Sequence, residues 1–345
     1  MRNDLDFKRI AVEEAFATRE ILQAYRDLLA HNGSPDIGFN SLMGYYLNSP
    51  AERTRAVAER LQDLGARRIA DMDATGIDVQ ILSLTSPGVR IFDADKAVGL
   101  ARDANDELAA AVAGRPDRYA GLAAIAPQNP AAAAAELERG VRNLGLKGAI
   151  VNSHTHGEYL DDPKFWDILA SAEALDVPIY LHPNTPSNAM IKPFIDRGLD
   201  GAVFGFAVET GLHALRLVVS GAFDRFPKLK IVLGHLGEGL PYWLFRIDFM
   251  HGASMRSGRY ASQPKLQRKA SDYLRENFYY TTSGMAWTPP IRYVQSVMGM
   301  DRVMYAMDYP YQFVPEEVNV TDELPIGYEN LKAFYQTNAE RVFKL

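Results

Sequence analysis

The 345-residue sequence contains no cysteine. The protein therefore has no disulfide bond, no thiolate metal ligand and no cysteine nucleophile. Long apolar runs are missing as well: no stretch is long enough to span a membrane, and the N-terminal residues MRNDLDFKRI lack the apolar core of a signal peptide. We expect a cytoplasmic protein that does not interact with membranes.

Basic clusters are also missing. The chain has 37 Lys and Arg against 43 Asp and Glu, and this net charge of -6 argues against nucleic acid as a partner. There is no glycine-rich phosphate loop, no dinucleotide-binding fingerprint and no Gly-x-Ser-x-Gly motif. A small molecule is the expected partner, and no organic cofactor is expected.

What the sequence does contain is a regular alternation of short apolar runs and helical segments. Apolar runs bounded by glycine or proline are typical of strands buried on both faces, as in a parallel sheet. Eight strands are expected, at 10–12, 79–84, 119–126, 146–151, 177–181, 229–233, 277–282 and 302–306. Helices are expected at 51–75, 94–114, 130–144, 163–175, 202–221, from 241 with an interruption near 252–265, at 288–298 and at 326–342. This order predicts a (β/α)8 TIM barrel, an α/β fold that forms one domain over residues 1–345.

Residues 17–50 do not fit the alternation. Residues 19–30 have the pattern of an amphipathic helix, whereas Gly, Pro and Asn punctuate 31–35 and 41–50 and predict a loop. We interpret 17–50 as an insertion after the first strand that covers the mouth of the barrel.

Four of the expected strands end in a residue that can bind a metal or carry a proton. The apolar runs stop at Glu13, His182, His235 and Asp308, where we expect the chain to turn. A TIM barrel builds its active site just past the carboxyl ends of its strands. A single histidine at a strand end is more often structural, so the agreement of four strands supports the site. Glu13, His182 and Asp308 predict a divalent cation, for which Mn²⁺, Zn²⁺ and Fe²⁺ are all suitable.

Four further residues are candidates for the chemistry. His235 is either another ligand or an acid–base group beside the metal. Glu238 is either the partner that orients His235 or a favourable negative charge at the start of a helix. Arg53 and Arg246 either pack structurally or bind a substrate carboxylate through two hydrogen bonds.

Other histidines are weaker candidates. His154 and His156 come after an apolar run that has already ended at Val151, and we interpret them as loop residues. His213 lies on an expected helix and is interpreted as structural.

Several segments together resemble a known group of enzymes. In these segments the chain is similar to the aromatic-acid decarboxylase branch of the amidohydrolase superfamily, and the likeness extends over almost the whole chain. They are Val12-Glu13-Glu14-Ala15-Phe16-Ala17-Thr18, Tyr180-Leu181-His182-Pro183, the run from Gly234 to Trp243, and Tyr305-Ala306-Met307-Asp308-Tyr309-Pro310-Tyr311. The resemblance implies a homodimer or homotetramer and a TIM-barrel enzyme that uses a divalent metal, Mn²⁺ first and Zn²⁺ as the alternative.

The resemblance also implies roles for single residues. Glu13, His182 and Asp308 are expected to hold the metal, and Arg53, Arg246 and Tyr311 to contact the substrate. Asp308 is the candidate proton donor, with His235 and Glu238 as the rival pair. Ala15 stands where much of the superfamily has the second residue of a Glu-x-His pair, so one usual ligand is missing.

We therefore expect non-oxidative decarboxylation of a hydroxybenzoate. The resemblance implies 5-carboxyvanillate as the substrate, with γ-resorcylate or 2,3-dihydroxybenzoate as alternatives. Two other classes stay open: a metal-dependent hydrolase of a lactone or amide, and a barrel that binds without catalysis.

Overall fold

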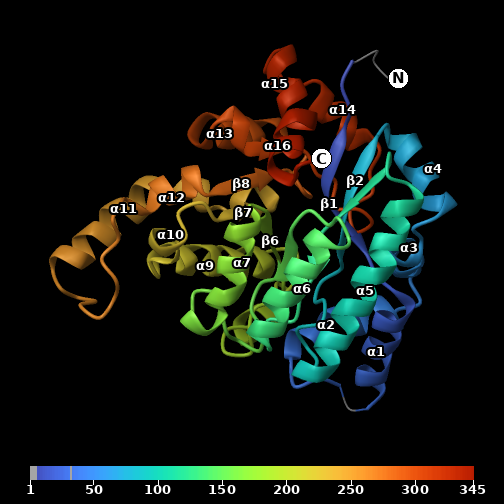
Figure 1. The fold of residues 1–345 in the computed structure, drawn as a ribbon, viewed down its shortest axis with the longest axis horizontal. Helices are drawn as coiled ribbons and strands as arrows, with labels where there is room; N and C mark the ends of the chain where they lie inside the picture. The colour runs from blue at the N-terminus through green and yellow to red at the C-terminus, as the bar shows by residue number, and fades with distance from the viewer. Residues whose placement is uncertain (1–5, 32) are drawn as a thin grey trace.

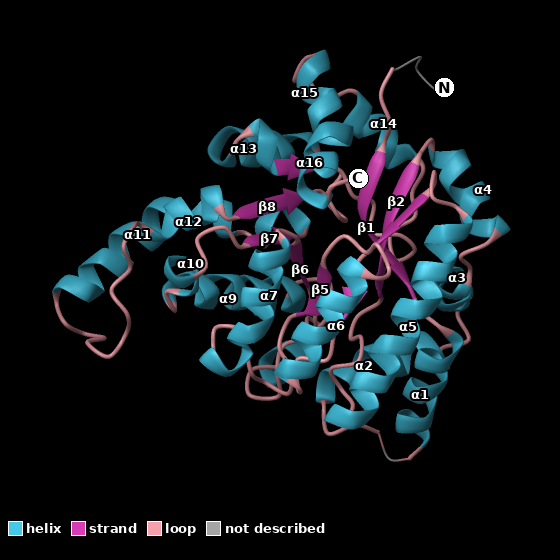
Figure 2. Ribbon diagram, viewed as in Figure 1, coloured by secondary structure: helices cyan, strands magenta, loops and turns pink. Residues whose placement is uncertain are grey.

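The structure of the protein is a computed structural model that describes residues 6–31 and 33–345. Parallel strands lie at the centre and helices surround them (Figures 1 and 2). The strands are β1 (Ile10–Phe16), β2 (Val79–Leu84), β3 (Tyr119–Gly121), β4 (Ala123–Ala124), β5 (Ala149–Asn152), β6 (Pro178–His182), β7 (Lys230–Leu233), β8 (Phe278–Thr281) and β9 (Val303–Met304).

The strands pair in chain order, all in parallel, as β1-β2-β3 and β4-β5-β6-β7-β8-β9. β3 and β4 are two halves of one expected strand: the Leu122 amide between them donates to Leu82 of β2, and the Ala123 amide donates to Gly148 beside β5. Two backbone hydrogen bonds join β1 to the chain after β9, from Val12 to Tyr305 (3.2 Å) and from Ala15 to Tyr309 (2.7 Å). The expected TIM-barrel fold is confirmed.

Alternate residues of the strands belong to two different apolar clusters. Ile10, Val12 and Tyr180 belong to a smaller cluster, whereas Ala11 and Leu181 belong to a larger one. Successive side chains of a strand point to opposite faces, so both faces of the sheet are packed. This explains why the strands read as continuous apolar runs.

Helices follow the strands along the chain. The longer ones are α1 (Arg19–Ala30), α2 (Ile37–Asn48), α3 (Glu52–Gln62), α4 (Ala66–Thr75), α5 (Ala94–Gly114), α6 (Pro130–Arg142), α7 (Trp166–Leu175), α9 (Gly205–Val219), α11 (Leu240–Arg256), α12 (Ala270–Glu276), α13 (Thr288–Met298) and α14 (Glu316–Asp322). Short helices are α8 (Lys192–Ile195), α10 (Ala222–Arg225), α15 (Tyr328–Lys332) and α16 (Asn338–Phe343).

Three expectations about the elements were wrong. Residues 41–50, expected as a loop, lie mostly in α2, which Asp36 caps by accepting a hydrogen bond from the Phe39 amide. The expected helix 51–75 is two helices, α3 and α4, separated near Gly65. The first strand does not turn at Glu13 but runs on to Phe16 with every residue buried.

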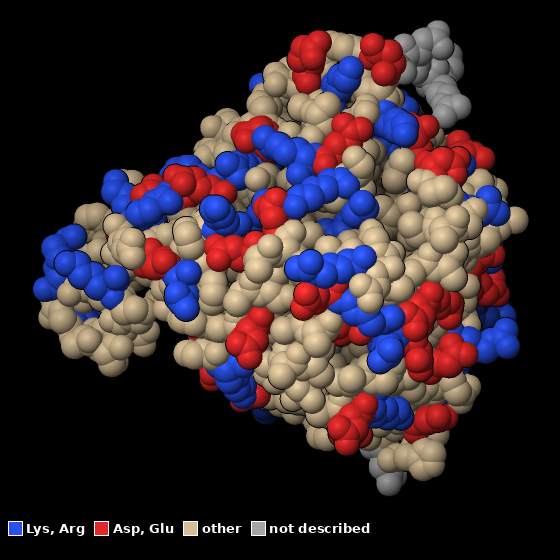
Figure 3. All heavy atoms as spheres, in the orientation of Figure 1, with Lys and Arg blue, Asp and Glu red and all other residues tan. Residues whose placement is uncertain are grey.

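Charged side chains of both signs are intermixed on the face seen in Figure 3, without an extended field of one sign. Among the residues that the structure describes, no helix combines the length and apolar character needed to cross a bilayer. The end of α11 and the loop after it project from the body of the molecule (Figure 1, left).

Candidate active site

Three side chains from separate strands meet in the barrel. One ligand atom from each of Glu13, His182 and Asp308 lies within 4.8 Å of the other two. Glu13 lies within β1, His182 is the last residue of β6, and Asp308 follows β9. Two carboxylates and an imidazole at this spacing make a donor set that suits a divalent cation.

The two oxygens of Glu13 have different surroundings. Oε2 accepts hydrogen bonds from three hydroxyl groups, those of Tyr180, Thr281 and Ser283. Oε1 is buried and accepts no hydrogen bond from any described residue, although His182 Nε2 lies 3.3 Å away. A buried carboxylate oxygen is costly unless a positive charge faces it, so this side chain fits a bound cation. Burial acts to raise the pKa of Glu13, but His235 and His182 lower it to about 2, and the carboxylate stays charged.

The glycine before His235 is required by Glu13. A Cβ at Gly234 would lie 2.6 Å from Glu13 Oε2. Only glycine lets the backbone after β7 pass so close to the carboxylate. This contact explains why a glycine stands at the end of this apolar run.

The ring of His182 is oriented by the backbone next to it. Its Nδ1 lies 2.8 Å from the carbonyl oxygen of Pro183, which can only accept. Nδ1 must therefore carry the proton, and Nε2 is left with a free lone pair on the side of Glu13. This is the tautomer that a metal-binding histidine needs.

His235 lies beside this cluster. Its Nε2 is 3.9 Å from Glu13 Oε1 and 3.8 Å from Asp308 Oδ2, and its Nδ1 is 3.1 Å from Glu238 Oε1. The Glu238 carboxylate thus lies near the ring nitrogen that points away from the cluster, without the geometry of a hydrogen bond, and its role as the orienting partner stays a prediction. Burial acts to lower the pKa of His235, but Glu238 and then Glu13 raise it well above its usual value.

Asp308 enters the cluster from a turn with an unusual backbone. Its φ of +70° lies in the left-handed region, which is rare for a residue other than glycine. Burial raises the pKa of its carboxyl group, while the nearby ring of His235 acts in the opposite direction. A raised pKa keeps a larger fraction of this carboxyl group protonated than in an exposed aspartate, and only the protonated form can act as a general acid.

A cavity of about 160 Å³ opens beside the cluster. It is lined by Leu42, Tyr46, Arg53, Ser86, His182, Pro183, Ala202, Phe206, His235, Asp308, Tyr311 and Gln312. Its wall is mostly apolar, with the cluster at one side and one arginine. A space of this kind suits an aromatic ring that carries a few charged groups.

Arg53 and Tyr311, which are predicted to contact the substrate, both line the cavity, and the contact itself stays a prediction. Arg53 is exposed, and its Nη2 donates to the backbone oxygen of Tyr311 at 3.1 Å. The Tyr311 hydroxyl lies 2.6 Å from Thr85 Oγ1, and burial raises the pKa of this phenol. Arg53 thus faces the cavity from its open side, and Tyr311 lies deeper.

Arg246 does not reach this cavity within the chain. α11 buries Leu240, Pro241 and Leu244, whereas Arg246 is exposed. Two residues correspond to about 200° around a helix, so Arg246 points away from the side that Leu244 buries. Arg246 therefore does not line this cavity among the described residues, and its contact with the substrate stays a prediction.

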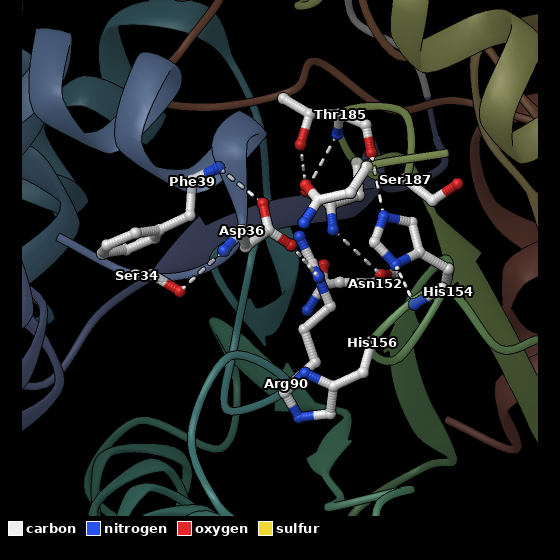
Figure 4. Close-up of polar contacts among 12 residues, drawn as sticks. Ser34, Asp36, Phe39, Arg90, Asn152, His154, His156, Thr185 and Ser187 are labelled. Atoms are coloured by element: carbon white, nitrogen blue, oxygen red, sulfur yellow. Dashed lines mark hydrogen bonds and ion pairs between the residues drawn. The ribbon is translucent and has the colours of Figure 1, made fainter. Parts of the chain in front are cut away.

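A separate polar cluster docks the insertion onto the barrel (Figure 4). Arg90, which follows β2, donates to the carboxylate of Asp36 at 2.7 Å, and both side chains are almost buried. His154 lies beside them, with Nε2 3.2 Å from the backbone oxygen of Thr185. Burial, with Arg90 next, lowers the pKa of His154 to about 3, so it is neutral. His154 and His156 are loop residues, as expected, outside the metal cluster.

Sequence reasoning missed several residues around the site. Leu42 and Tyr46 of α2 were assigned to a loop, and Ser283 and Glu14 were not considered. Thr281 and Ser283 follow the same rule as the predicted residues, since they lie at the carboxyl end of a strand. They were passed over because a hydroxyl group is a poor ligand for a divalent cation.

Comparison with known proteins agrees with this geometry. The model of the Amidohydrolase family matches residues 49–345. A crystal structure of 5-carboxyvanillate decarboxylase from Novosphingobium aromaticivorans, complexed with manganese and 4-hydroxy-3-methoxy-5-nitrobenzoic acid, shares 52% sequence identity at a TM-score of 0.97, and the match covers 99% of this chain and 97% of that one.

Two decarboxylases of dihydroxybenzoates are also similar. The structure of a dihydroxybenzoic acid decarboxylase from Polaromonas with bound manganese and the inhibitor 2-nitroresorcinol is 36% identical, with a TM-score of 0.84 over 98% of this chain and 97% of that one. γ-Resorcylate decarboxylase from Rhizobium is 37% identical over 345 residues, 98% of each chain.

Proposed function

The chain belongs to the amidohydrolase family as a carboxy-lyase of its aromatic-acid branch, and we propose that it converts 5-carboxyvanillate to vanillate and carbon dioxide. The observation that supports this substrate is the cavity lined both by His182 and Asp308 of the cluster and by a single arginine, Arg53. A carboxylate next to a phenol offers two oxygens to a cation, and a second carboxylate on the ring needs a cationic side chain.

Glu13, His182 and Asp308 would hold the divalent cation, for which Mn²⁺ is the first choice because the related decarboxylases bind it. When bound, the cation supplies Lewis-acid stabilisation of the negative charge on the substrate's phenolate oxygen.

The remaining cavity residues orient the ring. Arg53 would bind the carboxylate that is not lost, with its guanidinium held by the backbone oxygen of Tyr311. Leu42 and Phe206 offer apolar surface to the ring faces. This arrangement would place the ring carbon that bears the other carboxylate near Asp308.

Asp308 would deliver the proton on which the reaction depends. The proton adds to the ring carbon that bears the carboxylate, and this carbon becomes tetrahedral. The bond to the carboxylate then breaks, its electron pair restores the aromatic ring, and carbon dioxide leaves. Asp308 regains a proton from solvent. His235, whose Nε2 is 3.8 Å from Asp308 Oδ2, is the rival donor or the relay.

The insertion would serve as the cover of the site. Leu42 and Tyr46 of α2 line the cavity, and the Tyr46 ring lies edge-on to the ring of Tyr311 at 5.2 Å. Residues 17–50 would thus extend over the mouth and exclude water from the reacting carbon.

We also propose that the protein forms a homo-oligomer through α11. Large apolar side chains are exposed on and beside this helix: Tyr242, Trp243, Phe245, Phe249, Met250 and Trp287, with Phe245 83% exposed. Clustered exposed aromatic side chains mark interfaces between proteins. A second copy of the chain offers a matching apolar face.

Anaerobic incubation of the Mn²⁺-loaded protein with a panel of hydroxybenzoates tests the function. We expect carbon dioxide to be released fastest from 5-carboxyvanillate, and more slowly from γ-resorcylate and 2,3-dihydroxybenzoate. Faster release from γ-resorcylate would reassign the substrate. Ring opening of a lactone without carbon dioxide release would replace decarboxylation by hydrolysis.

A further inference from the structure

Glu14, the residue next to Glu13, lies directly behind the active site. It is fully buried. Each of its carboxylate oxygens accepts a backbone hydrogen bond from the chain after β9, across the junction where β1 meets β9, which we call the seam. Oε1 accepts from the Met307 amide at 2.9 Å, and Oε2 accepts from the Tyr309 amide at 3.2 Å. These two amides stand on either side of Asp308.

The seam at this point lacks a regular strand ladder. β9 ends at Met304, and the next backbone bond to β1 after Val12–Tyr305 is Ala15–Tyr309. Between these two bonds the carboxylate of Glu14 takes the place of backbone acceptors for Met307 and Tyr309. Asp308, held between them, has its φ of +70°. A strained conformation persists only where its surroundings fix it.

We propose that Glu14 is a positioning residue for Asp308: by bridging the two amides that flank Asp308, its carboxylate fixes the direction in which the Asp308 side chain enters the cavity. The Glu13–Glu14 pair then has a divided role. Glu13 is one of the three cluster residues, while Glu14 positions Asp308, the cluster residue on the opposite side of the seam.

The carboxylate is itself held in place. Gln80 Nε2 lies 3.4 Å from Glu14 Oε2, and Gln80 Oε1 accepts from the fully buried Arg68 at 3.2 Å. Arg68 also donates to the backbone oxygen of Ala15 at 2.7 Å, and its guanidinium lies 4.5 Å from the ring centre of Tyr309. Gln80 and Arg68 therefore support Glu14, and Arg68 also contacts Tyr309, the residue after Asp308.

The substitution Glu14→Gln tests the proposal. An amide has one acceptor oxygen, so its NH₂ group must face one of the two backbone N–H donors. Glu209→Gln is the matched control, because Glu209 is also fully buried and accepts a backbone hydrogen bond, from Ser187 at 3.1 Å, outside the cluster. We expect Glu14→Gln to weaken Mn²⁺ binding, followed by electron paramagnetic resonance, by about 10- to 100-fold. The control should bind Mn²⁺ like the wild type.

The measurement separates this proposal from the function on which it rests. Wild-type Mn²⁺ affinity in folded Glu14→Gln, or an equal loss in both variants, would overturn the positioning role even if the wild type decarboxylates. Failure of the wild type to release carbon dioxide would overturn the function and leave the metal-affinity comparison valid. If Glu14→Gln does not fold, Gln80→Met, which removes the side-chain contact to Glu14, should weaken Mn²⁺ binding in the same direction, and unchanged affinity there would overturn the proposal.

Discussion

At the scale of single residues, Asp308 has two proposed roles, metal ligand and proton donor, that a substitution can separate. Asp308→Asn keeps one ligand oxygen and the size of the side chain but removes the acid. We expect kcat to fall by about 10²- to 10⁴-fold because a general acid contributes that much. Mn²⁺ content, measured together with carbon dioxide release, gives the test, and Asp103→Asn on the exposed side of α5 is the control. Near-normal turnover with Mn²⁺ bound would assign the proton to His235.

Arg53 should decide the preference for a second carboxylate. Arg53→Ala removes the cationic side chain of the cavity wall, and Arg55→Ala on the same helix removes an exposed one outside it. We expect the KM for 5-carboxyvanillate to rise about tenfold in Arg53→Ala, since a hydrogen bond to a charged group is worth about 1.5–3 kcal/mol and solvent weakens it here. A hydroxybenzoate without the second carboxylate should show little change. Equal effects on both substrates would remove the dicarboxylate from the proposal.

His213 should make stability depend on pH. Burial, with His154 and Arg216 next, lowers its pKa from 6.5 to about 3. The unfolded chain therefore binds a proton below pH 6.5 that the folded protein does not, so this contribution to stability is present above pH 6.5 and is lost as the pH falls towards 3. In urea unfolding, the advantage of the wild type over His213→Gln should shrink by about 2 kcal/mol between pH 8 and pH 5. A constant difference would mean that the histidine is not held neutral.

Prediction of the site from sequence succeeded where one rule applied. Glu13, His182 and Asp308 were found because parallel strands deliver their carboxyl ends to one edge. Arg246 does not line the cavity within the described chain, because a helix position says which way a side chain points only after the buried face is known, and its role stays a prediction. Glu14 was missed because its partners are backbone amides nearly 300 residues away, which no local pattern reports.

At the scale of elements, the position of α2 depends on close contact at Gly38. A Cβ there would lie 2.0 Å from Thr185 Oγ1, whereas a Cβ at Gly44 of the same helix would meet only a Leu29 methyl group at 3.9 Å. We expect Gly38→Ala to destabilise the protein by about 1–3 kcal/mol through overpacking and to lower kcat/KM by shifting Leu42 and Tyr46. Gly44→Ala should leave both values near those of the wild type. Thermal unfolding and steady-state kinetics of the two variants give the comparison, and identical behaviour would contradict the docking of α2.

Helices and strands could be predicted from the sequence where the spacing of apolar residues and clear end signals determine them. The runs 79–84 and 288–298 coincide with β2 and α13 because both ends have clear local signals. α2 was missed because its glycines and asparagines read as loop residues, and tertiary contacts such as Arg90 with Asp36 hold it instead. β1 was cut short because buried carboxylates look like the end of an apolar run, although hydroxyl groups hold one oxygen of Glu13 and backbone amides hold both oxygens of Glu14 inside the barrel.

At the scale of the whole molecule, the apolar face of α11 should control assembly. Phe245→Glu places a charge at the most exposed aromatic position of that face, whereas Tyr328→Glu does so on α15, elsewhere on the surface (Figure 1). We expect Phe245→Glu to raise the dissociation constant of the oligomer by at least about tenfold, as for a central interface residue. Sedimentation of both variants measures this change. A monomeric wild type, or an unchanged mass in Phe245→Glu, would rule out α11 as the interface.

The insertion has a further consequence because it lies between the strand that bears Glu13 and the helix that bears Arg53. Leu42 and Tyr46 lie on α2, whereas none of the three candidate metal ligands does, so these two side chains can be exchanged while Glu13, His182 and Asp308 stay unchanged. Selection for a new aromatic compound can therefore act on this segment alone. Related barrels that share the ion site should then diverge most in this stretch of chain, and grafting it between them is a direct route to exchanging the compounds they accept.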